Sequence, residues 1–238
     1  MNSVQNENIN VKRMGFSSSI SLAVITLITF GLAFTAVPKS GPLCTANCIE
    51  YPYLDSLPFY PGDYYWMYLA ILQLVIWLIF MISLHYFSID KKKIFSFISI
   101  SFALISSVIL FVDYFIQFSV VPVSLMKGET DGIALLTQYN DHGIFIALEE
   151  LGYLMMSISF LFMAFALSGD SLPERSLRWI FIAPFILSII SLIYFSIKFG
   201  IDRSYRFEIT IISINWLAMV AGSILAGVLF KRIKKTEL

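Results

Sequence analysis

The sequence has 238 residues, of which 58% are hydrophobic and only 13% are charged, and its formal net charge is zero. About a quarter of the residues of a soluble domain are charged, so this composition excludes an ordinary soluble protein. The balanced charge also argues against a basic surface for nucleic acid. Together with a mean hydropathy of +0.81, these values predict an all-α integral membrane protein whose main partner is the lipid bilayer.

Six apolar segments predict six transmembrane helices in one bundle. Each segment is long enough to cross a bilayer, which takes about twenty residues of helix. The expected spans are residues 16–37, 64–87, 94–118, 142–167, 179–199 and 207–230. We therefore predict one transmembrane domain over residues 16–230, preceded by a polar tail (1–15) and followed by a basic tail (231–238).

The first apolar segment has a second interpretation, a cleaved signal peptide, because Lys12 and Arg13 directly precede it. Its length of about twenty-two residues exceeds that of a typical signal-peptide core and suits a spanning helix. The sequence that ends it, AFTAVPKSG, is also a poor cleavage site. We therefore favour an uncleaved first helix.

Two long connections join the predicted helices on one side. Residues 38–63 contain five of the eight prolines, which excludes a regular helix there. Residues 119–141 form the second connection, in which Gly132–Tyr139 is expected as a short interfacial helix behind an Asp131 cap. Asn140 or Asp141 is the expected N-cap of the helix that follows.

The distribution of basic residues predicts the orientation in the membrane. Cytoplasmic connections carry an excess of lysine and arginine, and a cytoplasmic N-terminus gives eleven basic residues inside and five outside. The outer five are Lys39, Lys127, Lys198, Arg203 and Arg206. We therefore predict a prokaryotic plasma-membrane protein with both termini in the cytoplasm.

Three carboxylates lie in the outer half of the predicted bundle: Asp113 in helix 94–118, and Glu149 and Glu150 in helix 142–167. Ionisable groups at such depth are costly and are usually paired, protonated or functional. Gln73 and Asn215 fall at a similar depth in two other helices.

Helical spacing predicts which of these side chains share a face. Ser99, Ser106 and Asp113 recur every seven residues, and Gln117 follows one turn later. These four positions give helix 94–118 one polar face. We expect that face to pack against another polar helix.

Helix 142–167 has a matching face formed by His142, Glu149 and Tyr153. Glu150 points about 100° away from Glu149. We therefore expect Glu149 to face Asp113, and Glu150 to face a neighbouring helix or a gap beside it.

The acidic cluster has no lysine or arginine at the same depth in this topology, so a shared proton or a bound cation is its expected counter-charge. The main hypothesis is a membrane protein that handles a small molecule or an ion, linked to protons or cations. The expected ligand or ion site contains Gln73, Asp113, Gln117, His142, Glu149, Glu150, Tyr153 and Asn215.

Two other functions stay open. The first is a membrane-embedded enzyme that acts on a lipid or isoprenoid, with Glu149 or Asp113 as the acid or base. The second is an accessory or scaffolding subunit without a ligand, in which the polar residues only hold helices together. The sequence contains no catalytic motif that decides whether the protein is an enzyme.

A metal site would use His142 and Glu149 with Asp113 or Asp141, but the sequence has no HExxH-type spacing. We therefore expect no metal and no cofactor. Cys44 and Cys48 lie in the outer loop and are expected either as a structural disulfide or as two free thiols.

Overall fold

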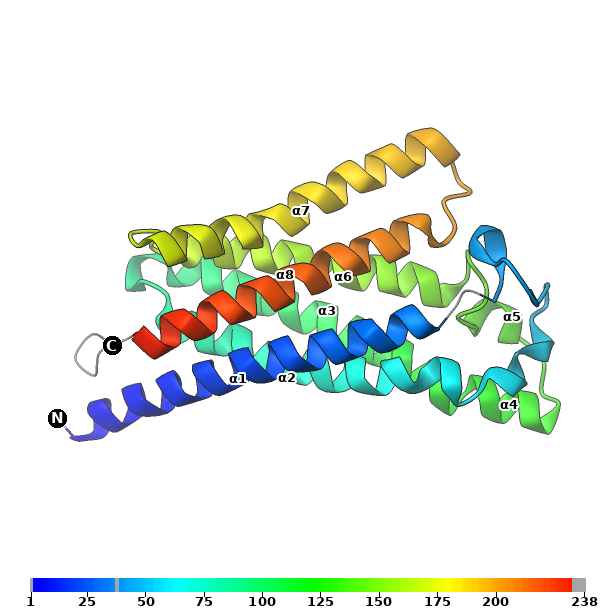
Figure 1. Cartoon of the computed structure of the whole chain (residues 1–238), viewed down its shortest axis with the longest axis horizontal. Coiled ribbons are helices and arrows are strands. Elements are labelled where there is room, and N and C mark those ends of the chain that lie inside the picture. The colour runs from blue at the N-terminus through cyan, green and yellow to red at the C-terminus, as the bar shows by residue number, and fades with distance from the viewer. Residues whose placement is uncertain (1, 37–38, 233–238) are drawn as a thin grey trace.

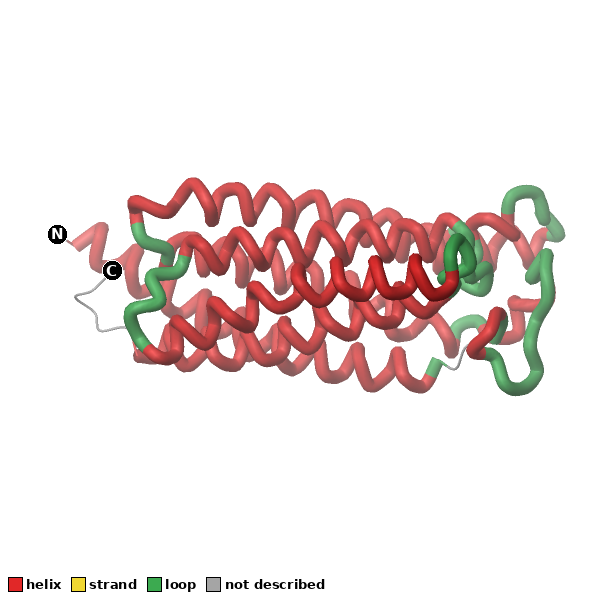
Figure 2. Tube along the Cα trace, turned by 90° about the horizontal axis from the view of Figure 1, so that it is seen from above, coloured by secondary structure: helices red, strands yellow, loops and turns green. Residues whose placement is uncertain are grey.

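The structure, a computed structural model, describes residues 2–36 and 39–232, and this part of the chain contains eight α-helices and no strand. Six of these helices are long and apolar enough to cross a membrane. They run along one common axis as a bundle (Figures 1 and 2). The expected all-α class and the six apolar helices are therefore present.

The described chain has six long helices, two short ones and four 3₁₀ turns, of which three lie between α1 and α2 and one between α2 and α3. The long helices are α1 (Asn2–Thr35), α2 (Tyr65–Phe87), α3 (Lys93–Ser119), α6 (Ile144–Ala166), α7 (Leu172–Phe199) and α8 (Tyr205–Arg232). The short helices are α4 (Val121–Lys127) and α5 (Ile133–Leu136), and the 3₁₀ turns are η1 (Gly41–Leu43), η2 (Leu54–Phe59), η3 (Gly62–Tyr64) and η4 (Asp90–Lys92).

Several helices begin earlier than the apolar segments do. Helix α1 starts at Asn2, because no proline interrupts the polar stretch that leads into the first span. Helix α7 starts at Leu172, where the Ser171 hydroxyl caps the first turn by accepting a hydrogen bond from the Glu174 amide. The ends expected at residue 37 and over the tail 233–238 lie outside the described residues.

The second long connection differs from the expected capping pattern. Gly132, in the left-handed region with φ 81°, is the N-cap of α5 in place of Asp131. Gly143 is the N-cap of α6 in place of Asn140 or Asp141. The Asn140 side chain instead accepts a hydrogen bond from the His142 amide at 3.1 Å and closes the turn before the helix.

The two ends of the bundle differ in character. Both chain termini lie at one end, the terminal end (Figure 1). The opposite end, the loop end, carries the connections between α1 and α2 and between α3 and α6. Helix α1 packs between α2 and α8, while α6 packs against α3, α7 and α8. This arrangement brings the first turns of α6 and α8 beside the last turns of α1 at the loop end.

Helices α3 and α6 form a polar seam. The Ser99 hydroxyl donates to the Ser159 carbonyl at 2.7 Å, and the Ser159 hydroxyl donates to the Ser99 carbonyl at 2.8 Å. Further along, Ser106 donates to the Gly152 carbonyl at 2.8 Å. A Cβ added to Gly152 would lie 2.6 Å from the Leu110 side chain, so only glycine allows this close approach.

Candidate functional site

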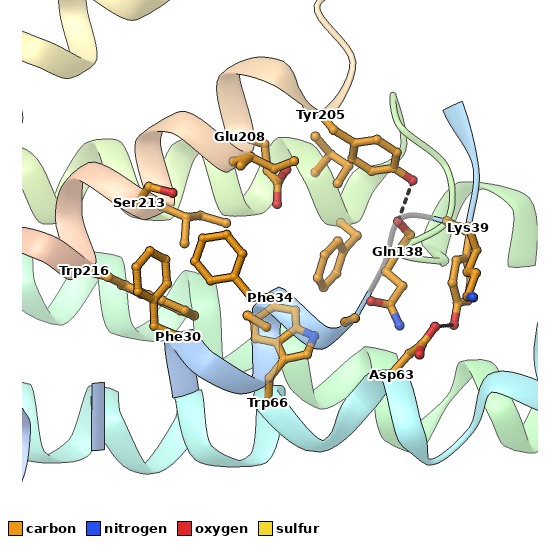
Figure 3. A pocket seen from close by; sticks show the side chains of 17 residues that line it. Phe30, Phe34, Lys39, Asp63, Trp66, Gln138, Tyr205, Glu208, Ser213 and Trp216 are labelled. Carbon is orange, nitrogen blue, oxygen red and sulfur yellow. Dashed lines mark hydrogen bonds between the residues drawn. The ribbon is translucent and has the colours of Figure 1, made fainter. Parts of the chain in front are cut away.

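A cavity of about 340 Å³ lies at the loop end between α1, α2, α6 and α8 (Figure 3). Its volume is in the lower part of the range of small-molecule sites, roughly 300–1,000 Å³. Seven of its seventeen lining residues are aromatic, and three are charged. The aromatic residues are Phe30, Phe34, Trp66, Tyr139, Phe145, Tyr205 and Trp216, and the charged ones are Lys39, Asp63 and Glu208.

Glu208 is the carboxyl group in the deep part of this cavity. It lies in the first turn of α8, and its side chain points into the space between the aromatic rings (Figure 3). The residue is only 8% exposed, and its Oε2 has no hydrogen-bond partner. A buried acceptor without a partner is costly, and this oxygen is closed to a ligand, so a proton is the group that relieves the cost.

Glu149 stands directly behind Glu208. The two carboxyl groups lie close enough to form a hydrogen-bonded pair once one of them carries a proton. Glu149 is fully buried, and its Oε2 also lacks a partner. Asp113 on α3 is buried beside them, within electrostatic range of both glutamates, and its Oδ2 is unpaired as well. Three helices thus bring three carboxyl groups together.

A chain of hydrogen bonds connects Glu149 to the far wall of the cavity. The Tyr114 hydroxyl donates to Glu149 Oε1 at 2.9 Å and lies 2.9 Å from the Tyr153 hydroxyl. The Trp216 indole donates to that Tyr153 hydroxyl at 3.0 Å. Trp216, at one end of this chain, lines the cavity, while Glu149, at the other end, lies behind Glu208 and does not line it.

The titratable groups around Glu208 come from several elements. Helix α3 contributes Asp113, and α6 contributes Glu149, Glu150 and Tyr153. Helix α8 itself contributes Tyr205. All of these except Tyr205 and Tyr153 are carboxyl groups, so the surroundings of Glu208 are acidic.

The cavity reaches the surface between α1 and α8. Phe34 in the last turn of α1 is 71% exposed, and Ile209 in the first turns of α8 is 41% exposed. Both residues line the cavity. The cavity is therefore open beside Phe34 and Ile209, on two helices that are long and apolar enough to span a membrane; we call this the lateral opening.

The loop-end wall of the cavity is polar and held by hydrogen bonds. The Tyr139 hydroxyl donates to Asp63 Oδ2 at 3.0 Å, and burial raises the pKa of Tyr139, so its phenol stays a donor. The Tyr205 hydroxyl donates to the Gln138 carbonyl at 3.1 Å and lies 2.8 Å from the Ser40 hydroxyl. These contacts fasten the loop after α1 to the start of α8.

Lys39 and Asp63 oppose each other's charge at this wall. Asp63 lies within electrostatic range of Lys39, whose Nζ is 5.1 Å from the centre of the Phe59 ring. With all three groups ionised, one lysine and two carboxylates leave the cavity lining with one net negative charge. That excess charge belongs to Glu208.

The structure brings some of the predicted site residues together. Asp113, Glu149 and Tyr153 lie in one buried network, with Asp113 and Glu149 on packed helices. The expectation that no basic residue reaches the acids is wrong for Glu150, which pairs with Arg203 at 2.9 Å. Glu150 therefore points toward the α7–α8 link and does not line the cavity.

The other predicted site residues lie elsewhere. Gln117 is hydrogen-bonded to the Leu136 carbonyl and accepts from the Gln138 amide, so it holds the loop after α5. His142 is exposed and contacts Asp141 at 2.8 Å. Neither side chain lines the cavity.

Gln73 and Asn215 are buried in the packed interior of the bundle and do not line the cavity. Gln73 Nε2 donates to the Met219 sulfur at 3.3 Å, and Asn215 Nδ2 donates to the Ile211 carbonyl at 2.9 Å. The side-chain oxygen of each lacks a partner. They are therefore buried polar groups that are not part of the candidate site.

Metal and disulfide chemistry are separate from the cavity. Among the described residues, no group of three or more His, Cys, Asp and Glu side chains is arranged to hold a metal ion. Cys44 and Cys48 are joined by a disulfide in the loop between α1 and α2.

Glu208 and Arg203 were not among the residues expected at the site. Glu208 is the second residue of the predicted span 207–230, and Arg203 precedes that span, so with Arg206 they looked like the charged start of the last helix. The signal that could have found Glu208 is its position one turn before Ile211 and Ile212, where the apolar pattern of the last helix is already present.

Comparison of the chain with protein-family models, with curated proteins and with solved structures gave no match. The cavity and the carboxyl cluster are therefore the features of the protein that bear on its function.

Proposed function

We propose that this is an integral membrane protein of a prokaryotic plasma membrane that binds a small molecule in the aromatic cavity, with binding linked to the protonation of Glu149 and Glu208. The observation that carries the proposal is the unpaired, buried Glu208 carboxyl group in the cavity wall with Glu149 directly behind it. Two buried like charges in contact cannot both ionise at little cost. A ligand that changes the charge of Glu208 therefore changes the proton bound by the pair.

We also propose that the loop end faces the outside and both termini face the cytoplasm. The bias of eleven basic residues to five supports this orientation. So does the Cys44–Cys48 disulfide, since disulfides form and persist on oxidising sides of membranes. In this orientation the cavity takes its ligand from the outer leaflet or the outer solution.

Labelling of single thiols in intact cells tests the orientation. In a background with Cys44 and Cys48 replaced by serine, a membrane-impermeant maleimide should label Lys127→Cys and spare Lys92→Cys. The opposite pattern would reverse the topology and move the cavity to the cytoplasmic side. Mass spectrometry of the unreduced wild type should find Cys44 and Cys48 bridged.

Infrared spectroscopy of the protein in nanodiscs tests the proton link. A band of protonated carboxyl groups should persist at neutral pH in the wild type. It should lose intensity in Glu149→Gln and in Glu208→Gln, because either change removes one partner of the pair. Glu150→Gln is the matched control, since that carboxylate is held by Arg203. Identical spectra in all four proteins would contradict the proposal.

A further inference from the structure

The charge and the walls of the cavity restrict what it accepts. Its lining combines aromatic rings with one carboxyl group in excess, Glu208. Aromatic faces attract cations, and a carboxylate oxygen without a donor is satisfied best by an N–H group. Anions would meet Glu208 without a compensating charge, because Lys39 is already opposed by Asp63.

We propose that the ligand of the cavity is a protonated amine with an apolar, preferably aromatic, body, which places its ammonium group on Glu208 and its body between the rings of α1 and α8. This inference rests on the proposed function and adds the class of ligand. The lateral opening beside Phe34 and Ile209 admits such a molecule from the bilayer, where amphiphilic amines accumulate.

The contacts of each part of the ligand follow from the cavity. The ammonium group donates to the Glu208 carboxyl group where it lines the cavity, while the fully buried Oε2 stays on the side away from the ligand. The apolar body packs on Phe30, Phe34 and Trp216, which line the cavity on one side of Glu208 (Figure 3). The proton shared with Glu149 is then no longer needed by Glu208, so it passes to Glu149 or leaves the pair. When the amine binds, the number of protons on the pair stays the same if the proton passes to Glu149, and it falls by one if the proton is released.

Three probes of one size and different charge test the proposal: 2-phenylethylamine, 2-phenylethanol and phenylacetate. Their binding is measured by calorimetry on the protein in phosphatidylcholine nanodiscs, a lipid without net charge. We expect the amine to bind most tightly and the carboxylate least. In Glu208→Gln the amine should lose about tenfold or more in affinity, the value of a charge-assisted hydrogen bond, while the alcohol should bind as in the wild type.

Two further variants control for surface charge and for folding. Asp202→Asn removes an exposed carboxylate from the same end of the bundle, outside the cavity, and should keep the amine preference. Ser213→Phe fills the cavity while every carboxyl group remains, so it should weaken the amine and the alcohol together. If Glu208→Gln fails to fold, the order of the three probes on the wild type and the effect of Ser213→Phe decide the question.

The outcomes separate this inference from the proposed function. Alcohol binding as tight as amine binding, an amine preference that survives in Glu208→Gln, or no binding of any probe would overturn the amine assignment. In each case an infrared band that responds to Glu149→Gln and Glu208→Gln would leave the proton-linked cluster standing. An unresponsive band would remove the proposed function and the amine assignment with it.

Discussion

The polar face of α3 meets two different environments along one helix. Toward the terminal end, the hydroxyl groups of Ser99 and Ser106 each donate a hydrogen bond to a backbone carbonyl of α6. Fourteen residues after Ser99 on the same face, Asp113 has an unpaired buried oxygen, as do Glu149 and Glu208 near it. The first region is a seam, and the second is a cluster whose hydrogen-bonding capacity is not used up within the protein.

This difference shows how polar groups that only join helices can be distinguished from polar groups that could bind a ligand or a proton. Hydroxyl groups that serve only to join helices find backbone carbonyls at 2.7–2.8 Å and need nothing else. Buried carboxyl groups that lack partners, one of them in the wall of a cavity, have a cost that packing does not explain. The following changes test whether the two regions behave as differently as their contacts imply.

The largest expected effect is on the seam. Gly152→Val should lower the free energy of unfolding by about 3 kcal/mol, the upper part of the usual range for overpacking, because the new side chain must displace Leu110. Denaturation in mixed micelles measures it. Gly31→Ala on α1 is the control, since nothing lies within 4 Å of its added Cβ. Equal effects of the two changes would show that the seam is not closely packed.

Two substitutions of Glu149 separate the effect of its hydrogen bonds from the effect of its charge. Glu149→Leu should cost about 1–2 kcal/mol, because the Tyr114 hydroxyl loses its acceptor and Glu208 loses its partner. Glu149→Gln keeps an acceptor for Tyr114 and should change stability by less than about 1 kcal/mol. The same unfolding assay compares them. A glutamine variant as unstable as the leucine variant would make Glu149 a structural residue.

The smallest expected effect is the loss of one hydroxyl from the seam. Ser159→Ala removes the reciprocal bond to Ser99 and should cost about 0.6 kcal/mol, the average for hydrogen bonds between membrane helices. Ser101→Ala is the control, because the Ser101 hydroxyl is exposed and bonds only within its own helix. Ligand binding should be unchanged in both proteins, and a binding defect in Ser159→Ala would show that seam and cavity are coupled.

The sequence predicted the parts of the fold that depend on hydropathy and helical period. Apolar length predicts a helix whatever its neighbours are, so all six long helices were anticipated. The seven-residue spacing of Ser99, Ser106 and Asp113 likewise identified side chains that are all buried.

What the sequence did not predict depends on contacts between distant segments. Glu208 meets Glu149 because the first turn of α8 lies beside α6, a placement that no local pattern contains. Arg203 reaches Glu150 for the same reason. Gln117 has the right helical spacing for the cluster, but it lies one turn closer to the loop end. There its side-chain amide donates to the Leu136 carbonyl and accepts from the Gln138 amide.

The lateral opening beside Phe34 has a thermodynamic consequence for how affinity is measured. At equilibrium the ligand has the same chemical potential in the water, in the lipid and in the cavity, so its affinity can be referred to either phase. Each added methylene contributes about 0.8 kcal/mol of transfer free energy, or roughly a fourfold higher partition coefficient. Homologous amines with equal affinities referred to the lipid should therefore show affinities referred to the water that rise by that factor per methylene, and the rise should stop when the ligand outgrows about 340 Å³.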